Sequence, residues 1–476
     1  MNIVWFRRDL RLADNPALKE ALAGGVAVIP CYIHAPDEEA PWSPGAASRW
    51  WLHETLVSLD EDIRLLGSRL IVRAGPTGPA LNQLLRETRA QTVYWNRLYE
   101  PAITARDQRL TASLKERGIE ARSFNAALLA EPWTVATKSG TPFRVFTPFW
   151  NAVARRLDEV PAPSSRPASL PTVSPQLSSL TIGELGLRPR INWVKKLAAA
   201  WRPSEAGARR QLTQSVETRI AKYRTTRDRP GETGTSRLSP YLHFGQLGPR
   251  QILHKVRAAQ RRRLLTAAAA DAFLRQIGWR EFAHHLLFHF PHTPQAPFQT
   301  AFEDLPTRSD PALIARWQQG QTGIPIVDAG MRELWTTGWM HNRVRMIVAS
   351  LLTKNLGIAW LEGARWFWDT LVDADLANNT LGWQWSAGCG ADAAPYYRIF
   401  NPVAQAERFD PDGEYQRRWV PELARLPDRW LPRPWEATPE ALDRAGVVLG
   451  TSYPRPIVDL KASRARALAD YHALRG

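Results

Sequence analysis

One stretch in the second half of the chain combines residue types that could receive a nucleobase. In DAFLRQIGWREFAHHLLF, residues 271–288, helical spacing places Gln276, Trp279 and Arg280 on one face beside an apolar stripe. An indole next to a guanidinium and an amide can hold a base by stacking and hydrogen bonding. Packing in the core is the alternative interpretation of Trp279. Gly278 costs about 1 kcal/mol relative to Ala inside a helix, which indicates that another group approaches the backbone there.

Two further stretches carry groups that suit phosphate. Residues 234–245, GTSRLSPYLHFG, are polar and turn-rich and lead into a helix that begins near Pro249. Small hydroxyl residues with exposed N–H groups near a helix start can bind phosphate oxygens, although an ordinary capped loop has the same composition. Residues 322–350 hold a turn entering a helix, where arginines would face phosphate. The polar and aromatic residues of this turn are Trp339, His341, Asn342, Arg343 and Arg345.

The sequence does not support a metal site. His285 and His289 have the spacing of metal ligands on a helix, but no Glu follows His285 directly and no third ligand is evident. Asp373 and Asp375 could begin a calcium loop, but the positions after them lack the third ligand, the required glycine and the closing acid. We therefore predict no bound metal.

Charge and composition narrow the class of protein. Lys+Arg 62 against Asp+Glu 46 gives a net charge of +16 and a pI near 10.3. A polyanion such as DNA is then a natural partner, with simple solubility as the alternative. Cys31 and Cys389 are too few for a disulfide framework, so we predict a reducing cytoplasm. The sequence contains no uninterrupted apolar run of about 18 residues, so a membrane span is not predicted.

The elements that must position these groups differ between the two ends of the chain. Residues 1–125 alternate apolar runs with helical patterns, which predicts a Rossmann-like parallel sheet covered by helices. No G-x-G-x-x-G fingerprint accompanies it, so this domain is not predicted to bind a dinucleotide. The predicted strands are Ile3–Phe6, Val26–Ile33, Arg69–Val72 and Thr92–Trp95, and the predicted helices are Ser48–Leu66, Pro79–Thr88 and Ala105–Arg117.

The remaining chain divides into a connection and a helical domain. Residues 126–203 form a long interdomain connection, and Val160–Leu180 within it is rich in Pro and Ser, as is typical of an exposed segment. Residues 204–476 show apolar side chains at three- and four-residue spacing, which predicts an all-helical domain. Its predicted helices are Ala206–Tyr223, Pro249–Ala259, Asp271–Phe288, Ile326–Thr336, Arg343–Asn355 and Trp360–Leu371.

Long motifs in one order resemble a known family. The opening VWFRRDLRLADNPAL, then TSRLS, WREF, residues 322–350, DADLANNTLGWQW at 373–385 and ADAAPYYRIFNP at 391–402 are similar to photolyases and cryptochromes. The resemblance is to the bacterial class I branch that acts on cyclobutane pyrimidine dimers, and it covers nearly the whole chain. It implies an α/β domain followed by a helical FAD-binding domain, and a monomer that binds double-stranded DNA containing pyrimidine dimers.

The resemblance also implies roles for individual residues. Excited, reduced FADH⁻ would donate the electron that splits the dimer, and an antenna pigment, folate or deazaflavin, is left open. Gln276, Asn379, Trp360 and Trp383 would serve the electron-transfer chemistry. The FAD-binding residues would be Tyr223, Thr235, Ser236, Arg237, Leu238, Ser239, Asn342, Asp373, Ala374, Asp375 and Asn379. The dimer- and DNA-binding residues would be Arg227, Gln276, Trp279, Arg280, Asn342, Arg343, Arg345, Met346, Trp385 and Gln405.

Three features depart from the family pattern. Repair enzymes usually carry Glu where this chain has Gln276, which keeps an N–H donor but cannot supply a proton. Thr307 stands where the family has the outer tryptophan of the electron-transfer chain, so photoreduction would either stop early or exit through another aromatic such as Trp317 or Trp366. Folate-binding members carry an Asn-Glu pair where this chain has Ala102-Ile103. A photoreceptor that binds FAD and DNA with weak or no repair is therefore the alternative to a photolyase.

Overall fold

The computed structural model describes residues 1–189, 191–393 and 396–475, so Ala394 and Pro395 of the ADAAPYYRIFNP motif lie outside it. By packing, the chain forms two units. The first contains residues 1–221, 236–291 and 372–377, and the second contains residues 222–235, 292–371 and 378–476. Among the helices described, none is long and apolar enough to cross a membrane. The two units are defined by packing alone, so the domain boundaries predicted from the sequence, 1–125, 126–203 and 204–476, remain a prediction.

The first unit contains a parallel sheet of five strands in the order β3-β2-β1-β4-β5. β1 is central and fully buried, and its Val4 pairs with Pro30 on one side and Tyr94 on the other. A continuous apolar run is typical of a strand covered on both faces. The predicted parallel sheet is thus confirmed. The strands are β1 (Asn2–Phe6), β2 (Val28–His34), β3 (Ile71–Ala74), β4 (Thr92–Asn96) and β5 (Glu120–Phe124).

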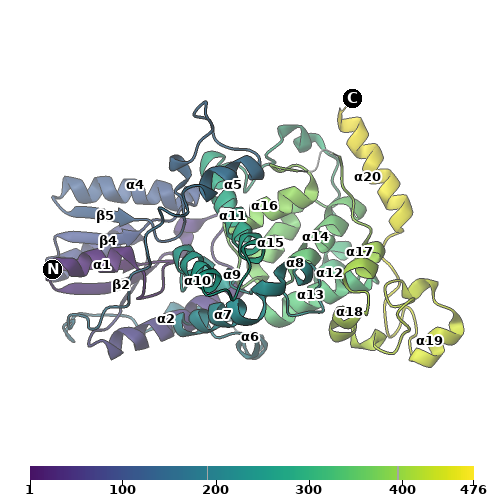
Figure 1. The fold of residues 1–476 in the computed structure, drawn as a ribbon, viewed down its shortest axis with the longest axis horizontal. Coiled ribbons are helices and arrows are strands. Elements are labelled where there is room, and N and C mark those ends of the chain that lie inside the picture. Colours follow the sequence, from purple (N-terminus) through teal and green to yellow (C-terminus); the bar gives the residue numbers. More distant parts are fainter. Residues whose placement is uncertain (190, 394–395, 476) are drawn as a thin grey trace. The chain divides into compact units, whose positions relative to one another are not determined.

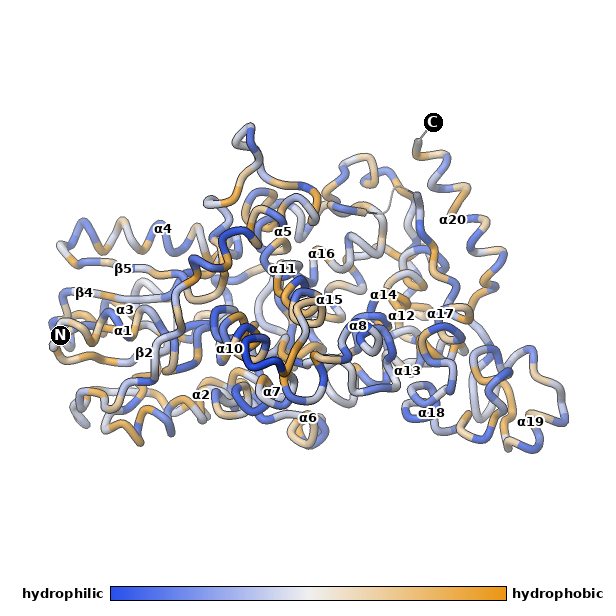
Figure 2. The backbone as a smooth tube through the Cα atoms, in the orientation of Figure 1, coloured by the Kyte–Doolittle hydropathy of each residue, from blue (hydrophilic) through white to orange (hydrophobic). Residues whose placement is uncertain are grey.

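Helices cover this sheet and supply its core. Leu81, Leu84 and Leu85 of α3 pack in one cluster with Leu110 and Leu114 of α4 and with buried strand residues, so these two helices share a face. Figure 1 shows α4 running alongside β5. Hydropathy alternates along α2 (Figure 2), as expected of a helix with one buried side. These helices are α1 (Pro16–Ala23), α2 (Ala46–Leu65), α3 (Thr77–Thr88) and α4 (Pro101–Glu116).

The Pro- and Ser-rich connection packs against the sheet. The backbone N–H of Leu170 donates to the carbonyl of Leu66, and that of Leu180 donates to the carbonyl of Val72. Val173 enters the core cluster beside α3 and α4. The remaining helices of the first unit are α5 (Phe146–Ala154), α6 (Val194–Ala200), α7 (Glu205–Thr218), α9 (Ser239–His243), α10 (Pro249–Arg261) and α11 (Ala267–His289).

The second unit is helical throughout the part described. Side chains cap its helix starts, as Asp310 does by accepting from the N–H groups of Ala312 and Leu313. The helices are α8 (Tyr223–Thr226), α12 (Pro311–Gln318), α13 (Pro325–Thr337), α14 (Asn342–Ser350), α15 (Trp360–Thr370), α16 (Leu376–Ala387), α17 (Pro402–Phe409), α18 (Glu414–Trp419), α19 (Pro439–Ala445) and α20 (Leu460–Arg475), and α16 starts in the first unit. A π-helical turn, η6 (Leu351–Asn355), continues α14.

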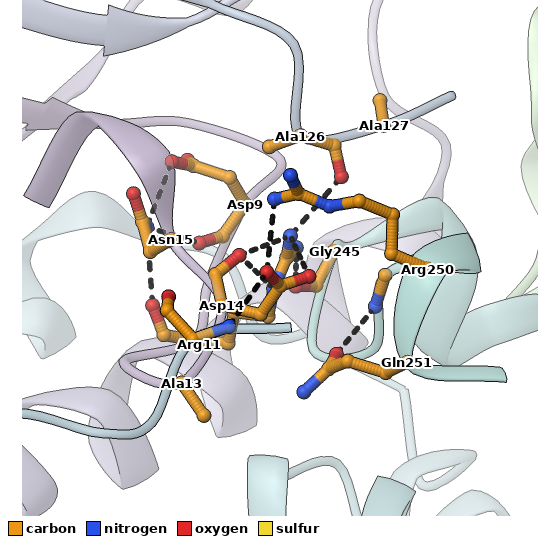
Figure 3. A network of polar contacts seen from close by, with 12 residues as sticks. Asp9, Arg11, Ala13, Asp14, Asn15, Ala126, Ala127, Gly245, Arg250 and Gln251 are labelled. Carbon is orange, nitrogen blue, oxygen red and sulfur yellow. Dashed lines mark hydrogen bonds and ion pairs between the residues drawn. The ribbon is translucent and has the colours of Figure 1, made fainter. Parts of the chain in front are cut away.

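A buried arginine joins distant parts of the first unit (Figure 3). The Arg11 guanidinium is 1% exposed and donates to the carbonyls of Asp14 (2.8 Å), Ala126 (3.0 Å) and Gly245 (2.7 Å). Its charge lies 3.9 Å from the Asp14 carboxylate, which also pairs with Arg250 at 2.9 Å. Burial lowers the pKa of Arg11 because a charge in the interior loses its hydration. The hydrogen bonds to three carbonyls and the ion pair offset that cost.

Arg11→Met should therefore lower the free energy of unfolding by about 3–5 kcal/mol, because it leaves three buried carbonyls without their donor and removes one of the two cations near Asp14. Urea denaturation followed by circular dichroism measures the change. Arg64→Met is the control, since Arg64 is 61% exposed and its pair with Asp60 contributes at most about 1 kcal/mol. Equal losses in the two variants would contradict a stabilising role for the buried network.

Candidate functional site

The candidate residues fall into two sets, one in each unit. In the first unit, side chains of α7 hold the loop before α9. The carbonyl oxygen of Ser236 accepts hydrogen bonds from Gln211 Nε2 (2.7 Å), Ser215 Oγ (3.3 Å) and Arg219 Nη1 (3.4 Å). Three donors on one oxygen fix the backbone of this loop, because leaving that oxygen without a partner would cost about 1–3 kcal/mol.

The same loop gathers positive charge. Arg237 has a φ of +53°, in the left-handed region, and its guanidinium carbon lies 5.1 Å from the centre of the Trp201 ring. Burial and the nearby Arg237 charge together lower the pKa of Arg219. The buried side chain of Leu238 anchors the turn. Two neighbouring arginines in the loop that leads into α9, which begins at Ser239, make a donor set that suits phosphate oxygens.

A buried carboxylate in the first unit lies close to two histidines. Asp375 Oδ2 is 3.6 Å from His243 Nδ1 and 3.5 Å from His284 Nε2. Burial opposes ionisation of Asp375, but the two histidines hold its pKa well below the usual range. Asp373 and Ala374, which precede it, are also buried. This segment is therefore a rigid, ionised feature of the interior.

The polar residues of α11 have different partners. Gln276 Nε2 makes a weak contact of 3.4 Å with a carbonyl one turn earlier, so its amide is only loosely held. Arg280 Nη1 donates to the carbonyl of Ala127 at 2.6 Å. Glu281 is buried, accepts from two backbone N–H groups, and has its pKa raised to about 7 by burial. Arg280 and Glu281 thus tie α11 to the segment after the sheet.

Trp279 stands in an aromatic stack. Its ring centre is 3.7 Å from that of Phe146 with 8° between the planes, and the Arg275 guanidinium carbon lies 4.7 Å from the Phe146 centroid. A Cβ at Gly278 would collide with the Trp150 ring, which explains the glycine inside α11. The prediction of a close neighbour at Gly278 is confirmed. One face of the Trp279 indole is covered, so a base can use only the other face or the edge.

In the second unit, two arginines of α14 are held by short contacts. Arg343 Nη2 pairs with Asp228 Oδ1 at 2.9 Å, and its guanidinium carbon lies 4.3 Å from the Phe409 ring centre. Arg345 Nε donates to the carbonyl of Met340 at 2.8 Å. These contacts fix the direction of both guanidinium groups.

The neighbouring candidates on α14 and before it are more loosely placed. Asn342 Nδ2 lies 3.9 Å from Met346 Sδ, which brings these two predicted residues together. Arg227 Nε is 3.6 Å from Asp228 Oδ2 and its side chain is 41% exposed. Asp228 therefore orients both Arg227 and Arg343.

A cavity of about 550 Å³ brings two of the predicted residues together in the second unit. Arg343 and Gln405 line it along with the aromatic rings of Tyr396, Phe400 and Phe409. We call this the inner cavity. A basic, aromatic lining of this size can hold a flipped base by stacking while a guanidinium binds phosphate.

Trp385 lines a smaller cavity with residues that the sequence analysis missed. The Arg398 guanidinium carbon lies 5.7 Å from the Trp385 ring centre and its Nη2 donates to Tyr396 Oη at 2.9 Å. Lys354 Nζ donates to the Arg398 carbonyl and lies 4.3 Å from the centre of the Tyr397 ring. Burial lowers the pKa of Lys354 to about 7. The arginine of the RIFNP motif was the only available signal for this group.

Trp383 is the centre of an aromatic cluster. Its ring centre is 4.9 Å from that of Phe367 and 6.2 Å from that of Trp317. Trp317 is fully buried and its Nε1 donates to the carbonyl of Val348 at 3.1 Å. A Cβ at Gly363 would collide with the Trp383 ring, so α15 accepts this indole only because Gly363 has no side chain.

The other members of the predicted electron path lie on or near α15. Trp360 is half-buried at the start of that helix, and Thr307 is exposed. Trp366 stacks on Trp335 with ring centres 6.1 Å apart and 6° between the planes, and Trp335 is 40% exposed. Asn379 Nδ2 donates to the α15 carbonyl of Ala364 at 3.1 Å, which turns the Asn379 oxygen away from that helix.

The last two candidates, Tyr223 and Thr235, belong to the second unit and precede Ser236 in the sequence. Tyr223 is buried at the start of α8, and burial raises the pKa of its hydroxyl to about 12. Thr235 follows Gly234, whose α-carbon packs against the backbone of Thr226 too closely for a side chain. The chain therefore folds back on α8 before it reaches Ser236.

Comparison with known proteins places both halves of the chain. Residues 2–168 match the family model described as DNA photolyase, and residues 273–473 match the one described as the FAD-binding domain of DNA photolyase. The chain is 45% identical to the deoxyribodipyrimidine photo-lyase of Agrobacterium fabrum over 99% of its length and 98% of the relative. It is 40% identical to cryptochrome-2 of Arabidopsis thaliana over 97% of its length and 77% of the relative.

A solved structure is similar along the entire chain. The crystal structure of a bacterial class III photolyase from Agrobacterium tumefaciens matches with a TM-score of 0.96 and 44% identity, covering 100% of this chain and 97% of that one. The sequence motifs resemble the class I branch, whereas this solved structure is a class III photolyase. The similar proteins thus belong to more than one class.

Substituting the glycine under Trp383 tests the packing of the aromatic cluster. Gly363→Ala should lower the free energy of unfolding by about 1–3 kcal/mol, because the added methyl group displaces the indole. Gly382→Ala is the matched control: no atom lies within 4 Å of its added methyl, and Ala in a helix should stabilise by about 0.4–1 kcal/mol. Effects of the same sign in urea denaturation would contradict this packing.

Proposed function

Because this chain belongs to the DNA photolyase family, we propose that it is a deoxyribodipyrimidine photo-lyase, which uses blue light and FAD to split cyclobutane pyrimidine dimers in double-stranded DNA. The 45% identity to a deoxyribodipyrimidine photo-lyase along 99% of the chain carries the proposal. A monomer in the cytoplasm is part of it. The two cysteines, Cys31 and Cys389, are buried free thiols, which agrees with a reducing compartment.

The donor sets fit the parts of FAD. The Arg237 guanidinium and the hydroxyls of Ser236 and Ser239 suit its phosphates. Thr235 comes just before them in the chain, and Tyr223 is buried at the start of α8. When bound and reduced, FAD supplies the electron that opens the dimer under light. The remaining proposed FAD residues are Leu238, Asn342, Asp373, Ala374, Asp375 and Asn379.

Asn379 has a defined orientation for its part in this site. Nδ2 donates one of its two hydrogens to the carbonyl of Ala364, which leaves the amide oxygen and the second N–H for a cofactor. The oxygen can accept from a ring nitrogen that carries a proton, and the second N–H can donate to one that does not. The contact with Ala364 limits how far the amide can rotate.

The dimer would be bound by residues that stack, bridge and neutralise. Trp279 and Trp385 present indoles, Asn342 and Gln276 present amides, and Arg343 binds phosphate from the rim of the inner cavity. Arg280 takes part less directly, since it is bonded to the carbonyl of Ala127. The other proposed contacts are Arg227, Arg345, Met346 and Gln405.

Electrons for photoreduction would pass through Trp383 and Trp360. Of the two predicted exits, Trp317 is fully buried, whereas Trp366 stacks on the partly exposed Trp335. An exit must exchange electrons with a reductant at the surface. We therefore assign it to Trp366 and Trp335, in place of the tryptophan that Thr307 replaces.

A photoreceptor that binds FAD and DNA but repairs poorly is the second candidate. Gln276, which stands where repair enzymes usually carry Glu, favours it, and so does 40% identity to a cryptochrome. The deciding experiment is to reduce the purified protein chemically, add dimer-containing DNA and illuminate it with blue light. Disappearance of dimers supports the photo-lyase, and tight binding without any loss of dimers supports the photoreceptor.

Gln276→Glu should raise the yield of dimer splitting per absorbed photon. A carboxyl group can donate a proton or a hydrogen bond to the charged intermediate, and hydrogen bonds to charged groups contribute about 1.5–3 kcal/mol, so we expect about a tenfold gain. The yield is measured on chemically reduced protein with dimer-containing DNA. Gln214→Glu, on the exposed side of α7, controls for the added charge. An unchanged yield would place the limit on repair elsewhere.

Phe146→Leu should weaken the preference for dimer-containing over undamaged DNA by about two- to tenfold, since an aromatic pair contributes about 0.5–1.5 kcal/mol and Trp279 would lose its stacking partner. The ratio of the two dissociation constants measures this preference. Phe149→Leu is the control: Phe149 lies on the same helix and is equally buried, but it packs on Phe282 and His285. If both variants change the ratio equally, the stack does not position Trp279.

A further inference from the structure

A second, larger cavity adjoins the inner cavity in the second unit. It measures about 740 Å³ and shares Ile399, Phe400, Asn401 and Arg464 with its neighbour. We call it the outer cavity. Residues 399–401 thus form a wall between the two cavities, and Arg464 stands at their junction.

The acidic groups of the outer cavity are already engaged. Asp459 Oδ1 accepts from the N–H groups of Lys461 and Ala462, both at 2.8 Å, and so caps the start of α20. Arg433 lies between two carboxylates, at 2.7 Å from Glu407 and 3.8 Å from Glu436. Neither acid of the lining is therefore positioned to neutralise a further cation.

Three other cations of the lining are exposed and remain available. Arg455, Lys461 and Arg464 make no side-chain ion pair or hydrogen bond with the described residues of the chain. Lys461 and Arg464 are three residues apart on α20 and so project from the same side of that helix. The lining of the outer cavity has four cationic and two acidic side chains, so it carries an excess of positive charge.

The rest of the lining limits what can bind there. Phe400, Val403, Pro456 and Trp435 give the cavity an apolar side next to the cations. All three free cations are exposed, so they are accessible to a large charged partner. An extended polyanion, in which phosphates alternate with less polar sugars, matches a lining that combines exposed cations with apolar side chains.

We infer that the outer cavity binds the sugar-phosphate backbone of duplex DNA beyond the dimer, across the wall of residues 399–401 from the inner cavity. The inference rests on the proposed function, because it takes the inner cavity, lined by the proposed dimer contacts Arg343 and Gln405, as lying beside the lesion. Continuity of the two cavities at Arg464 makes duplex DNA the occupant. DNA flanking the dimer then adds affinity without adding sequence preference, since phosphate contacts do not read bases.

The test uses the flavin-containing full-length protein with Arg455, Lys461 and Arg464 each changed to Gln. Affinity is measured against salt for a duplex that ends about two base pairs past the dimer and for one that extends about ten base pairs further on each side. On the long duplex, the slope of log affinity against log salt should fall by about 2–3, because each phosphate that the protein no longer neutralises lowers it by about 0.9. On the short duplex it should stay unchanged.

A matched triple variant removes the same charge elsewhere. Arg425, Arg429 and Arg444 are exposed residues of the second unit that line neither cavity, and changing them to Gln should leave both slopes as they are. Equal decreases on the short and long duplexes, no decrease on either, or the same decrease in the control variant would each overturn the inference. Competition by inorganic phosphate at millimolar concentration would also overturn it, in favour of a small-anion site.

Failure of the proposed function would give a different result. If the unmodified protein does not prefer dimer-containing DNA, the photo-lyase proposal fails, but the long undamaged duplex still reports on the outer cavity. If it prefers the dimer while the triple Gln variant keeps the full salt slope, only the outer-cavity inference fails. Unchanged flavin absorption in each variant shows that the helical domain is intact.

Discussion

The buried charge of Arg11 is the constraint on which the first unit depends. A guanidinium that is 1% exposed must be given hydrogen-bond acceptors, and it takes them from three separate stretches of chain, at Asp14, Ala126 and Gly245. Gly245 meets this demand with a φ of +67°, and its α-carbon packs against the backbone of Arg8 and Asp9 too closely for a side chain. The end of the central strand is thereby tied to the residues just after α9.

The same junction connects the central strand of the sheet to the loop at Ser236. The backbone N–H of Leu10 donates to the carbonyl of Phe244, and that of Leu12 donates to Glu205 at the start of α7. α7 in turn holds the Ser236 carbonyl through Gln211 and its neighbours. Although its sheet lacks a dinucleotide fingerprint, the first unit thus positions the loop at Ser236 through Leu10 and Leu12, more than 200 residues earlier in the sequence.

Local pattern predicted the elements that are apolar and long, and it failed where tertiary contacts decide. Continuous apolar runs predicted β1 and β4, because such short runs are typical of buried strands. β5 was missed because its EARSF sequence is polar, which is tolerated in an edge strand that pairs with only one neighbour. Gly278 indicated a close neighbour but not that it would be Trp150, since the sequence of α11 alone does not tell which helix packs against it. Trp335 was missed for the same reason: its partner Trp366 lies on another helix.

Binding and bond-splitting make separate demands on this site, and the chain meets them unequally. Binding needs aromatic rings held in place, and Trp279 is fixed by a parallel stack on Phe146 at 3.7 Å that does not depend on any acid. Bond-splitting needs a group that responds to the charge arriving on the dimer, and the group that we propose for it is the loosely held amide of Gln276, 3.4 Å from the carbonyl of Ala272. An amide can reorient and donate, so it can lower the energy of a negative charge, but it cannot neutralise that charge by proton transfer. Because Gln276 and Trp279 lie three residues apart on one helix, we expect a change at position 276 to affect bond-splitting while the stack of Trp279 on Phe146 stays in place.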